Sequence, residues 1–523
     1  MMARATVRPP SPESKIPMGA SFTDLTLSHW APPNRAVGLI PQPPACGLGH
    51  AARRAIDTAL RAEGYGLHMP ASQSTALLTD KYELTMLDAA LQSGTAGRRS
   101  VFELFGRGLP PTRRFGVVAG TGRILEALER FQFSPEQVAW LDSQDFLSDR
   151  ALDFLSDFRF SGDIYGYQEG ECYFPGSPLL TVESTFAEGT LLETLLLSIL
   201  NYDCAVASAA SRMTIAAHGR PCIDMGARRA HERAAVSAAR AAYIGGFEAT
   251  SDLEAGKRYG LPTVGTSAHS FTLVHDTEEE AFAAQIASLG PETTLLVDTY
   301  NVRDGVARAV EAARAAGGEL GAVRLDSGDL VAEAFRVRDQ LDALGATSTK
   351  ITVTSDLDEY AIAALGAAPV DSYGVGTRLV TGSGVPTAAL VYKLVSREDK
   401  DGVMVPVEKK SQSKGTVGGL KVAGRLYGPD GHASQEALLT GYTMKEGQEL
   451  LEQAGARPLQ VPLIVDGQIV SDLWDAPQTA IAQEHQRVTR NELPYAAWRL
   501  SEGDPGIPTR YYSPTNPLGA EQN

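Results

Sequence analysis

Short apolar runs alternate with amphipathic helical segments between residues 293 and 377. The apolar runs are TTLLVDTY, AVRLDSG, ITVTSD and DSYGVGT, and the helical segments between them are VRDGVARAVEAARAAGG, DLVAEAFRVRDQLDALG and LDEYAIAALGAAP. This alternation is typical of βα units, in which each helix covers the strands of a parallel sheet. We therefore predict an α/β fold with an irregular, barrel-like parallel sheet over residues 180–395.

The composition of the sequence outside this region is different. From residue 396 it becomes charged and glycine-rich (SREDKDGVMVPVEKKSQSKGTVGG), which favours antiparallel strands joined by turns. We predict a smaller α+β domain built from both flanks, residues 75–179 and 396–523. Near its start, the helical pattern YELTMLDAALQSG has Thr79 and Asp80 as candidate caps and Gly94 as a stop signal.

The first 74 residues have the composition of a segment that does not fold alone. Nine of the thirty prolines fall within residues 1–44, among serine, arginine and glycine, without sustained hydrophobic periodicity. Such a segment cannot bury enough apolar surface to offset its ordering entropy. We predict that residues 1–74 form a disordered extension.

Charge and cysteine content narrow the classes of partner. The formal net charge of −16 disfavours nucleic acid and anionic membranes, although a local basic pocket can still hold a small anion. The four cysteines form no C-x-x-C pair, which fits a reducing compartment. The longest apolar run, LLETLLLSIL, is interrupted by Glu193 and is too short to span a bilayer. We expect a cytoplasmic protein without a membrane span.

Polar residues close each predicted strand of the parallel sheet. The closing segments are DTY at 298–300, RLDSGD at 324–329, SD at 355–356 and GVGT at 374–377. Ligands bind at the carboxyl ends of parallel strands, so four polar closings in succession predict an assembled site. Each segment alone is equally compatible with ordinary helix caps and turns.

Two of these closings favour anion binding. Arg324 lies in an otherwise apolar strand end and needs an anionic partner, either a ligand or the nearby Asp326 or Asp329. The glycines of GVGT allow backbone N–H groups to approach a phosphate, with the Thr377 hydroxyl as a further donor, but they also suit a plain tight turn. The chain has no P-loop or dinucleotide fingerprint.

The residues alone leave more than one role possible for each of two basic motifs. MGARRAHE places Arg228, Arg229 and His231 together, either as a solvated helix start or as a second anion cradle. VGTSAHSF places His269 among small residues, where the imidazole could pack, bind a metal with His275, move a proton or act as a nucleophile.

The motifs TDKYELTM, MGARR, GTSAHS, VDTYN, VRLDSGDL, YGVGT and VYKLV occur in this order. In order and identity they resemble the nicotinate phosphoribosyltransferase family of type II phosphoribosyltransferases, from about Leu77 into the 490s. The resemblance implies synthesis of nicotinate mononucleotide and pyrophosphate from nicotinate and phosphoribosyl pyrophosphate, in NAD salvage. It also implies coupling to ATP hydrolysis, with Mg²⁺ on the phosphates.

The resemblance also implies roles for individual residues. His269 becomes the phosphorylated histidine and Asp298 the carboxylate that orients it. Tyr82 would stack on the pyridine ring of the neighbouring subunit's site, which implies a homodimer with shared sites. The implied substrate-binding residues are Tyr82, Arg228, Thr266, Arg324, Asp326, Ser355, Gly374, Gly376 and Thr377; metal ligands are not implied.

Two positions depart from the family pattern. Met225 stands where relatives often have an aromatic residue, and Asp252 where they usually have asparagine; we expect the Asp252 carboxylate to point away from the substrate. The alternatives are a nicotinamide phosphoribosyltransferase, a barrel metallohydrolase using His269 and His275, and an inactive ligand sensor.

Overall fold

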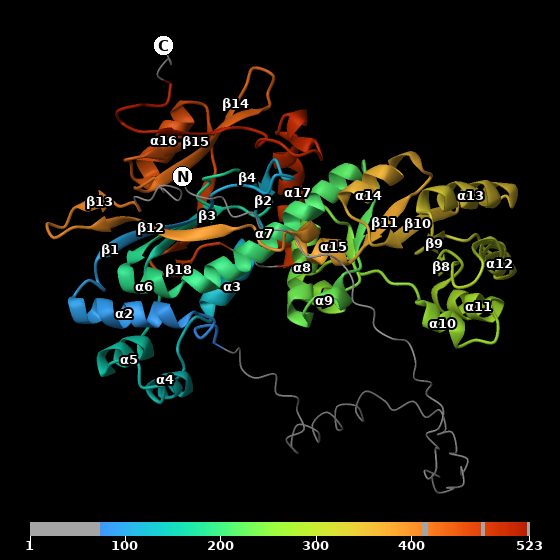
Figure 1. Ribbon diagram of the computed structural model, residues 1–523, viewed down its shortest axis with the longest axis horizontal. Coiled ribbons are helices and arrows are strands. Elements are labelled where there is room, and N and C mark those ends of the chain that lie inside the picture. Colours follow the sequence, from blue (N-terminus) through green and yellow to red (C-terminus); the bar gives the residue numbers. More distant parts are fainter. Residues whose placement is uncertain (1–73, 410–416, 472–475, 520–523) are drawn as a thin grey trace, which may run out of the picture. The chain divides into compact units, whose positions relative to one another are not determined.

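A computed structural model of the chain describes residues 74–409, 417–471 and 476–519 (Figure 1). These residues belong to one compact unit that begins at Ser72. The predicted disordered extension lies outside the described residues as far as residue 73.

Within the described residues, the parallel sheet has six strands in the order β7-β6-β11-β10-β9-β8. Every printed pair in it is parallel, and β7 and β8 form its two edges. The sheet therefore curls without closing, as an irregular half-barrel, and the predicted fold class is confirmed. Its strands are β6 (Cys222–Asp224), β7 (Ala249–Thr250), β8 (Thr294–Leu296), β9 (Ala322–Leu325), β10 (Lys350–Ser355) and β11 (Ser372–Val375).

Helices join these strands as the alternating pattern predicts. Before three of them, a polar residue accepts a backbone hydrogen bond from the first turn: Asn301 before α12, Asp329 before α13 and Asp358 before α14. The helices here are α8 (Glu232–Ile244), α9 (Leu253–Tyr259), α10 (His269–Leu273), α11 (Glu278–Leu289), α12 (Val302–Ala315), α13 (Leu330–Ala343), α14 (Glu359–Ala364) and α15 (Thr377–Val380). Some polar strand closings thus do serve as caps, as the alternative interpretation allowed.

A seven-stranded sheet, in the order β13-β12-β1-β5-β3-β17-β18, takes its strands from distant parts of the chain. All its printed pairs are antiparallel. Strands β5 and β12 join this sheet although they start within residues 180–395, because their partners β1 and β3 lie on the amino-terminal side. The strands are β1 (Arg99–Gly106), β3 (Asp163–Tyr167), β5 (Leu180–Thr185), β12 (Leu390–Glu398), β13 (Met404–Pro406), β17 (Gln460–Val465) and β18 (Gln468–Ile469).

A four-stranded sheet follows in the carboxyl-terminal part, in the order β16-β14-β15-β19. Its central pair, β14 (Lys421–Tyr427) and β15 (Ala433–Thr440), is antiparallel, as the texture after residue 396 predicts. The other strands are β16 (Arg457–Pro458) and β19 (Thr509–Tyr512), and β2 (Gly116–Val117) pairs separately with β4 (Cys172–Tyr173). The accompanying helices are α16 (Met444–Gln453) and α17 (Ala476–Asn491).

Helix α2 (Lys81–Ser93) starts after Asp80 and ends at Gly94, as predicted. Gly94 has a φ of 75°, the left-handed conformation that glycine adopts without steric cost. Neighbouring helices are α3 (Thr121–Glu129), α4 (Pro135–Asp142), α5 (Asp149–Ser156) and α6 (Phe186–Leu191).

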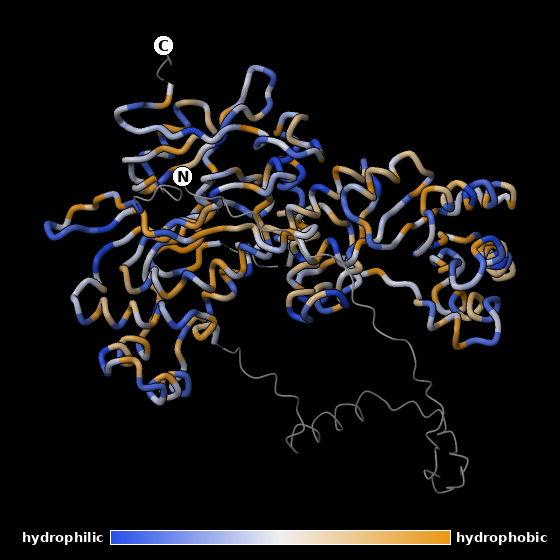
Figure 2. The backbone as a smooth tube through the Cα atoms, in the orientation of Figure 1, coloured by the Kyte–Doolittle hydropathy of each residue, from blue (hydrophilic) through white to orange (hydrophobic). Residues whose placement is uncertain are grey.

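Helix α7 (Glu193–Ala216) contains most of the longest apolar run of the chain, LLETLLLSIL, which begins at Leu191. Among the described residues it is the one helix that length and composition would allow to cross a membrane, but 72% of its most apolar window is buried inside the molecule. It packs against α8 and α14, as a core helix does. Figure 2 shows hydrophobic stretches along the strands of the seven-stranded sheet and a hydrophilic turn between β12 and β13.

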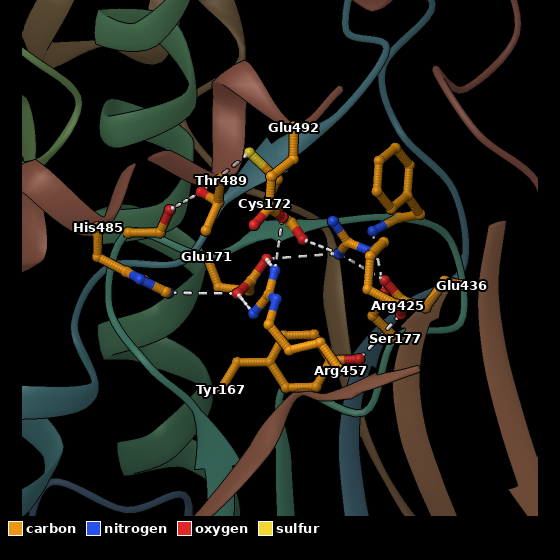
Figure 3. Close-up of polar contacts among 12 residues, drawn as sticks. Tyr167, Glu171, Cys172, Ser177, Arg425, Glu436, Arg457, His485, Thr489 and Glu492 are labelled. Carbon is orange, nitrogen blue, oxygen red and sulfur yellow. Dashed lines mark hydrogen bonds and ion pairs between the residues drawn. The ribbon is translucent and has the colours of Figure 1, made fainter. Parts of the chain in front are cut away.

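A buried ionic network fastens the carboxyl-terminal sheet to the segment around β4 (Figure 3). Glu171 accepts hydrogen bonds from Arg457 at 2.7 Å and His485 at 3.2 Å, and lies 3.5 Å from Arg425. Arg425 also pairs with Glu436 at 3.0 Å. We call these five residues the ionic network; they come from four separate stretches of sequence.

Candidate active site

A cavity of about 480 Å³ opens at the carboxyl ends of the parallel strands. Three of the four strand closings identified in the sequence, RLDSGD, SD and GVGT, contribute to its lining, because parallel pairing brings these ends to one edge of the sheet. Of the predicted residues, those that line the cavity are Arg228, Thr266, His269, Arg324, Asp326, Ser355, Gly374, Gly376 and Thr377. The structure brings these nine side chains and glycines together.

His269 begins α10 and stands at the cavity wall with 41% of its side chain exposed. Its Nδ1 lies 3.1 Å from the Thr299 hydroxyl, and its Nε2 lies 3.8 Å from Oδ1 of Asp298. Both ring nitrogens therefore face a group from the segment that follows β8. One edge of the imidazole remains open to the cavity, so the ring is accessible to a ligand.

Asp298 is almost fully buried behind the histidine, with 1% of its side chain exposed. Its Oδ2 accepts hydrogen bonds from the backbone N–H of Asp326 at 2.9 Å and from the hydroxyl of Ser327 at 2.8 Å. Its Oδ1 is buried without a hydrogen-bond partner and faces His269. The RLDSGD segment thus fixes the carboxylate, which leaves one oxygen for the imidazole.

Arg324 has no carboxylate partner within the described chain. Its Nη1 donates to the Thr266 hydroxyl at 2.9 Å and its Nη2 to the Ser267 carbonyl at 3.1 Å, while its Nε is buried without a partner. Burial lowers the pKa of this guanidinium, against the opposing effect of Asp326 and Asp298. The internal salt bridge weighed from the sequence is absent here, so the charge is available to an anionic ligand.

The two carboxylates proposed as internal partners of Arg324 have other roles. Asp329 caps α13 by accepting from the Ala332 N–H at 3.2 Å. Asp326 accepts a hydrogen bond from the Thr354 hydroxyl and lines the cavity. A carboxylate held in this way at the cavity wall can accept hydrogen bonds from ligand hydroxyls.

Different residues of the MGARRAHE motif fit the two interpretations, an anion cradle and a helix start. Arg228 and Arg229 lie in the short helix η1 (Ala227–Arg229), are exposed and line the cavity. His231 instead caps α8, where its Nδ1 accepts from the Arg233 N–H at 3.3 Å. The arginines lie at the rim of the cavity, where their charges can meet an anion, whereas the histidine belongs to a helix start.

The GVGT segment approaches its neighbours closely. A Cβ at Gly374 would meet Cγ2 of Thr354 at 2.5 Å and the sulfur of Met225 at 2.7 Å. Glycine is favoured there, and the Met225 thioether, noted in the sequence as a departure from the family pattern, lines the cavity beside it. Gly376 then precedes α15, whose first residue is Thr377.

Asp252 lies behind the cavity wall. Its carboxylate caps α9 by accepting from the Ala255 N–H at 2.9 Å, and it is not among the lining residues. It points away from the cavity, as expected.

Sequence reasoning missed Asp224, which closes β6 in the run CIDMG. Its buried carboxylate accepts from the Thr250 hydroxyl at 2.7 Å and from the Gly226 N–H at 2.8 Å, and burial raises its pKa. It fixes the start of the MGARR motif against β7. Thr299, Ser327 and Asp356 lie in the polar strand closings predicted from the sequence, but nothing in the sequence assigned them individual roles.

Tyr82 lies outside this cavity. It is on α2, with 44% of its surface exposed, and burial together with Glu193 raises the pKa of its phenol to about 12. One chain alone therefore does not bring Tyr82 to the site that its motif implies.

The described residues contain no group of three or more His, Cys, Asp or Glu that could hold a metal ion. His275, the second histidine of the metallohydrolase alternative, bonds the Phe271 carbonyl at 2.8 Å and does not line the cavity. The geometry gives that alternative no support.

A carboxylate-backed histidine and unpaired arginines at the strand ends of an α/β half-barrel define an enzyme site for small anionic substrates. Residues 77–201 match the model of the nicotinate phosphoribosyltransferase (NAPRTase) N-terminal domain. Two nicotinate phosphoribosyltransferases of Mycobacterium tuberculosis are 53% and 38% identical, over 84% and 80% of this chain and 96% and 88% of their own lengths. The chain belongs to the nicotinate phosphoribosyltransferase family of enzymes.

More distant relatives agree with this placement. The nicotinate phosphoribosyltransferase of Bacillus subtilis is 37% identical over 71% of this chain and 76% of its own length. The crystal structure of human nicotinic acid phosphoribosyltransferase shares the fold, with a TM-score of 0.69 and 24% identity, over 84% of this chain and 98% of that one.

Proposed function

We propose that this enzyme joins nicotinate to phosphoribosyl pyrophosphate, releasing nicotinate mononucleotide and pyrophosphate, and couples the reaction to ATP hydrolysis through phosphorylation of His269. One observation carries the proposal: a histidine backed by a buried carboxylate shares a cavity with an arginine that has no internal anion. The family's activity supplies the substrates, and the cavity supplies matching chemistry.

Each substrate group has a complementary partner in the cavity. The nicotinate carboxylate is assigned to Arg324, whose guanidinium is otherwise bound only to neutral oxygens. The 5′-phosphate is assigned to the turn at Gly374–Thr377 and to Arg228. The ribose hydroxyls fall to Asp326. This arrangement favours nicotinate over nicotinamide, because a neutral amide leaves the Arg324 charge unpaired.

Bond cleavage at the ribose builds positive charge on the sugar and negative charge on the departing pyrophosphate. The arginine rim stabilises the leaving group electrostatically. Mg²⁺ typically binds through one or two carboxylates together with substrate phosphates, and Asp326 and Asp356 line the cavity in positions that fit this use. When bound, the ion would neutralise pyrophosphate charge.

His269 is the proposed phosphoryl acceptor, and Asp298 the residue that orients it. A carboxylate beside one ring nitrogen fixes the tautomer and raises the nucleophilicity of the other nitrogen. Because Asp298 faces Nε2, we assign the attack on the γ-phosphorus of ATP to the lone pair of Nδ1. Hydrolysis of the labile N–P bond would then draw the transfer toward product.

We further propose a cytoplasmic homodimer with shared sites, in which Tyr82 of each chain completes the site of the other. Its exposure on α2, away from its own chain's cavity, supports this assignment.

Incubation with γ-labelled ATP tests the central step. The wild-type enzyme should take up an acid-labile, base-stable label that His269→Ala abolishes and the control His275→Ala retains. Absence of label on the wild-type enzyme would contradict the phosphohistidine, and equal label on His269→Ala would place it elsewhere. Parallel rates with nicotinate and nicotinamide should favour nicotinate; a preference for the amide would refute the substrate assignment.

A further inference from the structure

Two consecutive residues after β8, Asp298 and Thr299, flank the two nitrogens of the His269 ring. The Thr299 hydroxyl lies 3.1 Å from Nδ1, and the unpartnered Oδ1 of Asp298 lies 3.8 Å from Nε2. Asp298 has an assigned role, whereas no role has yet been given to the hydroxyl beside Nδ1.

The direction of the Thr299 hydrogen bond follows from the carboxylate on the other side of the ring. An ionised carboxylate only accepts hydrogen bonds, so Oδ1 of Asp298 favours a proton on Nε2. A neutral imidazole protonated on Nε2 has a lone pair on Nδ1. A threonine hydroxyl can donate or accept, so with this tautomer Thr299 is the donor to Nδ1.

We propose that Thr299 is a positioning residue for His269, which selects Nδ1 as the phosphoryl acceptor and afterwards holds the transferred group. The proposal rests on the proposed phosphohistidine. Before transfer, the hydroxyl donates to the Nδ1 lone pair and fixes the ring; on arrival of the donor, it rotates from the nitrogen to a phosphoryl oxygen.

The step balances without any further reactant. The Nδ1 lone pair forms the N–P bond to the γ-phosphorus of ATP, and the bond from that phosphorus to the bridging oxygen breaks, with its electron pair leaving on ADP. The proton stays on Nε2, so the phosphorylated ring carries a positive charge that Asp298 neutralises across the ring. The Thr299 hydroxyl adds a charge-assisted hydrogen bond to the new phosphoryl group.

Removal of the hydroxyl without a change of shape isolates this role. Thr299→Val should slow label uptake from γ-labelled ATP by roughly three- to tenfold, the range for loss of one hydrogen bond. Thr299→Ser, which keeps the donor, should label within about twofold of the wild-type rate. Thr294→Val, on the half-buried start of the same strand, is the matched control and should label normally.

A second measurement reads the ring itself and needs no ATP. In enzyme labelled with [15N]histidine, the His269 signals, assigned with His269→Ala, should show one Nε2–H tautomer in the wild type and in Thr299→Ser. Thr299→Val should show a mixture of tautomers.

Wild-type labelling kinetics together with an unchanged tautomer in Thr299→Val would overturn the proposal. If the wild-type enzyme takes no label at all, the phosphohistidine fails, and the tautomer signals still decide whether Thr299 positions the ring.

Discussion

The cavity and the ionic network use the same side-chain types in opposite ways. In the network, each of the carboxylates Glu171 and Glu436 meets an arginine at 2.7 or 3.0 Å. At the cavity, Arg324 contacts only neutral oxygens among the described residues, and one oxygen of Asp298, behind His269, has no hydrogen-bond partner there. Charges that find partners inside the chain hold the fold together, and charges left without them are available to a ligand.

The pKa shifts of the two regions express this difference. Although burial raises it, the hydrogen bonds from His485 and Arg457 and the charge of Arg425 bring the pKa of Glu171 down to about 2. For Arg324 burial prevails and lowers the pKa. The carboxylate of the network is stabilised in its charged form by neighbours within the chain. The Arg324 guanidinium lacks a bonded carboxylate among the described residues and would be stabilised by an anionic ligand.

The largest expected effect is a loss of folding stability when the ionic network is broken. Glu171→Gln leaves Arg457 and Arg425 without their shared carboxylate and should lower the free energy of unfolding by about 3–5 kcal/mol. The Michaelis constants for both substrates should stay near wild-type values in the folded fraction. Denaturant titration measures the first quantity, and the exposed pair member Glu484→Gln, with no measurable loss, is the control.

The same variant has a defined pH dependence. The pKa of Glu171 is about 2 in the folded protein, against an ordinary value of 4.5, so its stabilisation is complete above about pH 4.5 and is lost as the pH falls toward 2. The stability gap between wild type and Glu171→Gln should therefore narrow across that window. A gap that stays constant would show that the network does not act through this charge.

A smaller effect is expected in the cavity, where a substitution should change the Michaelis constant and leave the free energy of unfolding nearly unchanged. Arg324→Ala should raise the Michaelis constant for nicotinate by about 10- to 100-fold, as expected for loss of a charge-assisted contact, with little change in unfolding. Arg324→Lys should recover part of the loss, since lysine keeps the charge but not the planar fork. Arg303→Ala, on the exposed face of α12, is the control. Equal constants for Arg324→Ala and wild type would place nicotinate elsewhere.

The smallest effect is expected at Asp252, a charge near the cavity that already has an internal partner. Asp252→Asn keeps an oxygen that can cap α9, so stability should change by less than about 0.5 kcal/mol. The ratio of rates with nicotinate and nicotinamide should stay the same. A marked rise in nicotinate use would show that this carboxylate reaches the ligand and that the cap is not its role.

The parallel sheet and most of its site could be predicted because both depend on local pattern. Each βα repeat marks its own strand end, and parallel pairing gathers those ends at one edge, so Arg324 and Asp326 could be placed near GVGT from spacing alone. The role proposed for His269 could not be predicted from its neighbours in the sequence. Its residue environment left four functions open, and only the order of motifs along the chain favoured one.

The ionic network could not be predicted, since its members have no sequence relation that reveals their contact. Glu171 and Arg457 lie 286 residues apart and meet only through tertiary packing. Thr299 lies in the predicted DTY closing but could not be given a role, because a threonine after a strand is common and only the position of the imidazole gives its hydroxyl a partner. The contribution proposed for Tyr82 requires a second chain, and the fold of one chain does not place it at the cavity.

The seven-stranded sheet has a consequence for synthesis on the ribosome. Strand β1 pairs on one side with β5, but its other partner, β12, follows late: Arg99 bonds Glu398, 299 residues further on. At about 5–20 residues per second, translation takes roughly 15–60 s to cover that distance. During this interval one edge of β1 is unpaired, and an unpaired apolar edge is a template for aggregation. The nascent chain, rather than the finished enzyme, is therefore the aggregation-prone species.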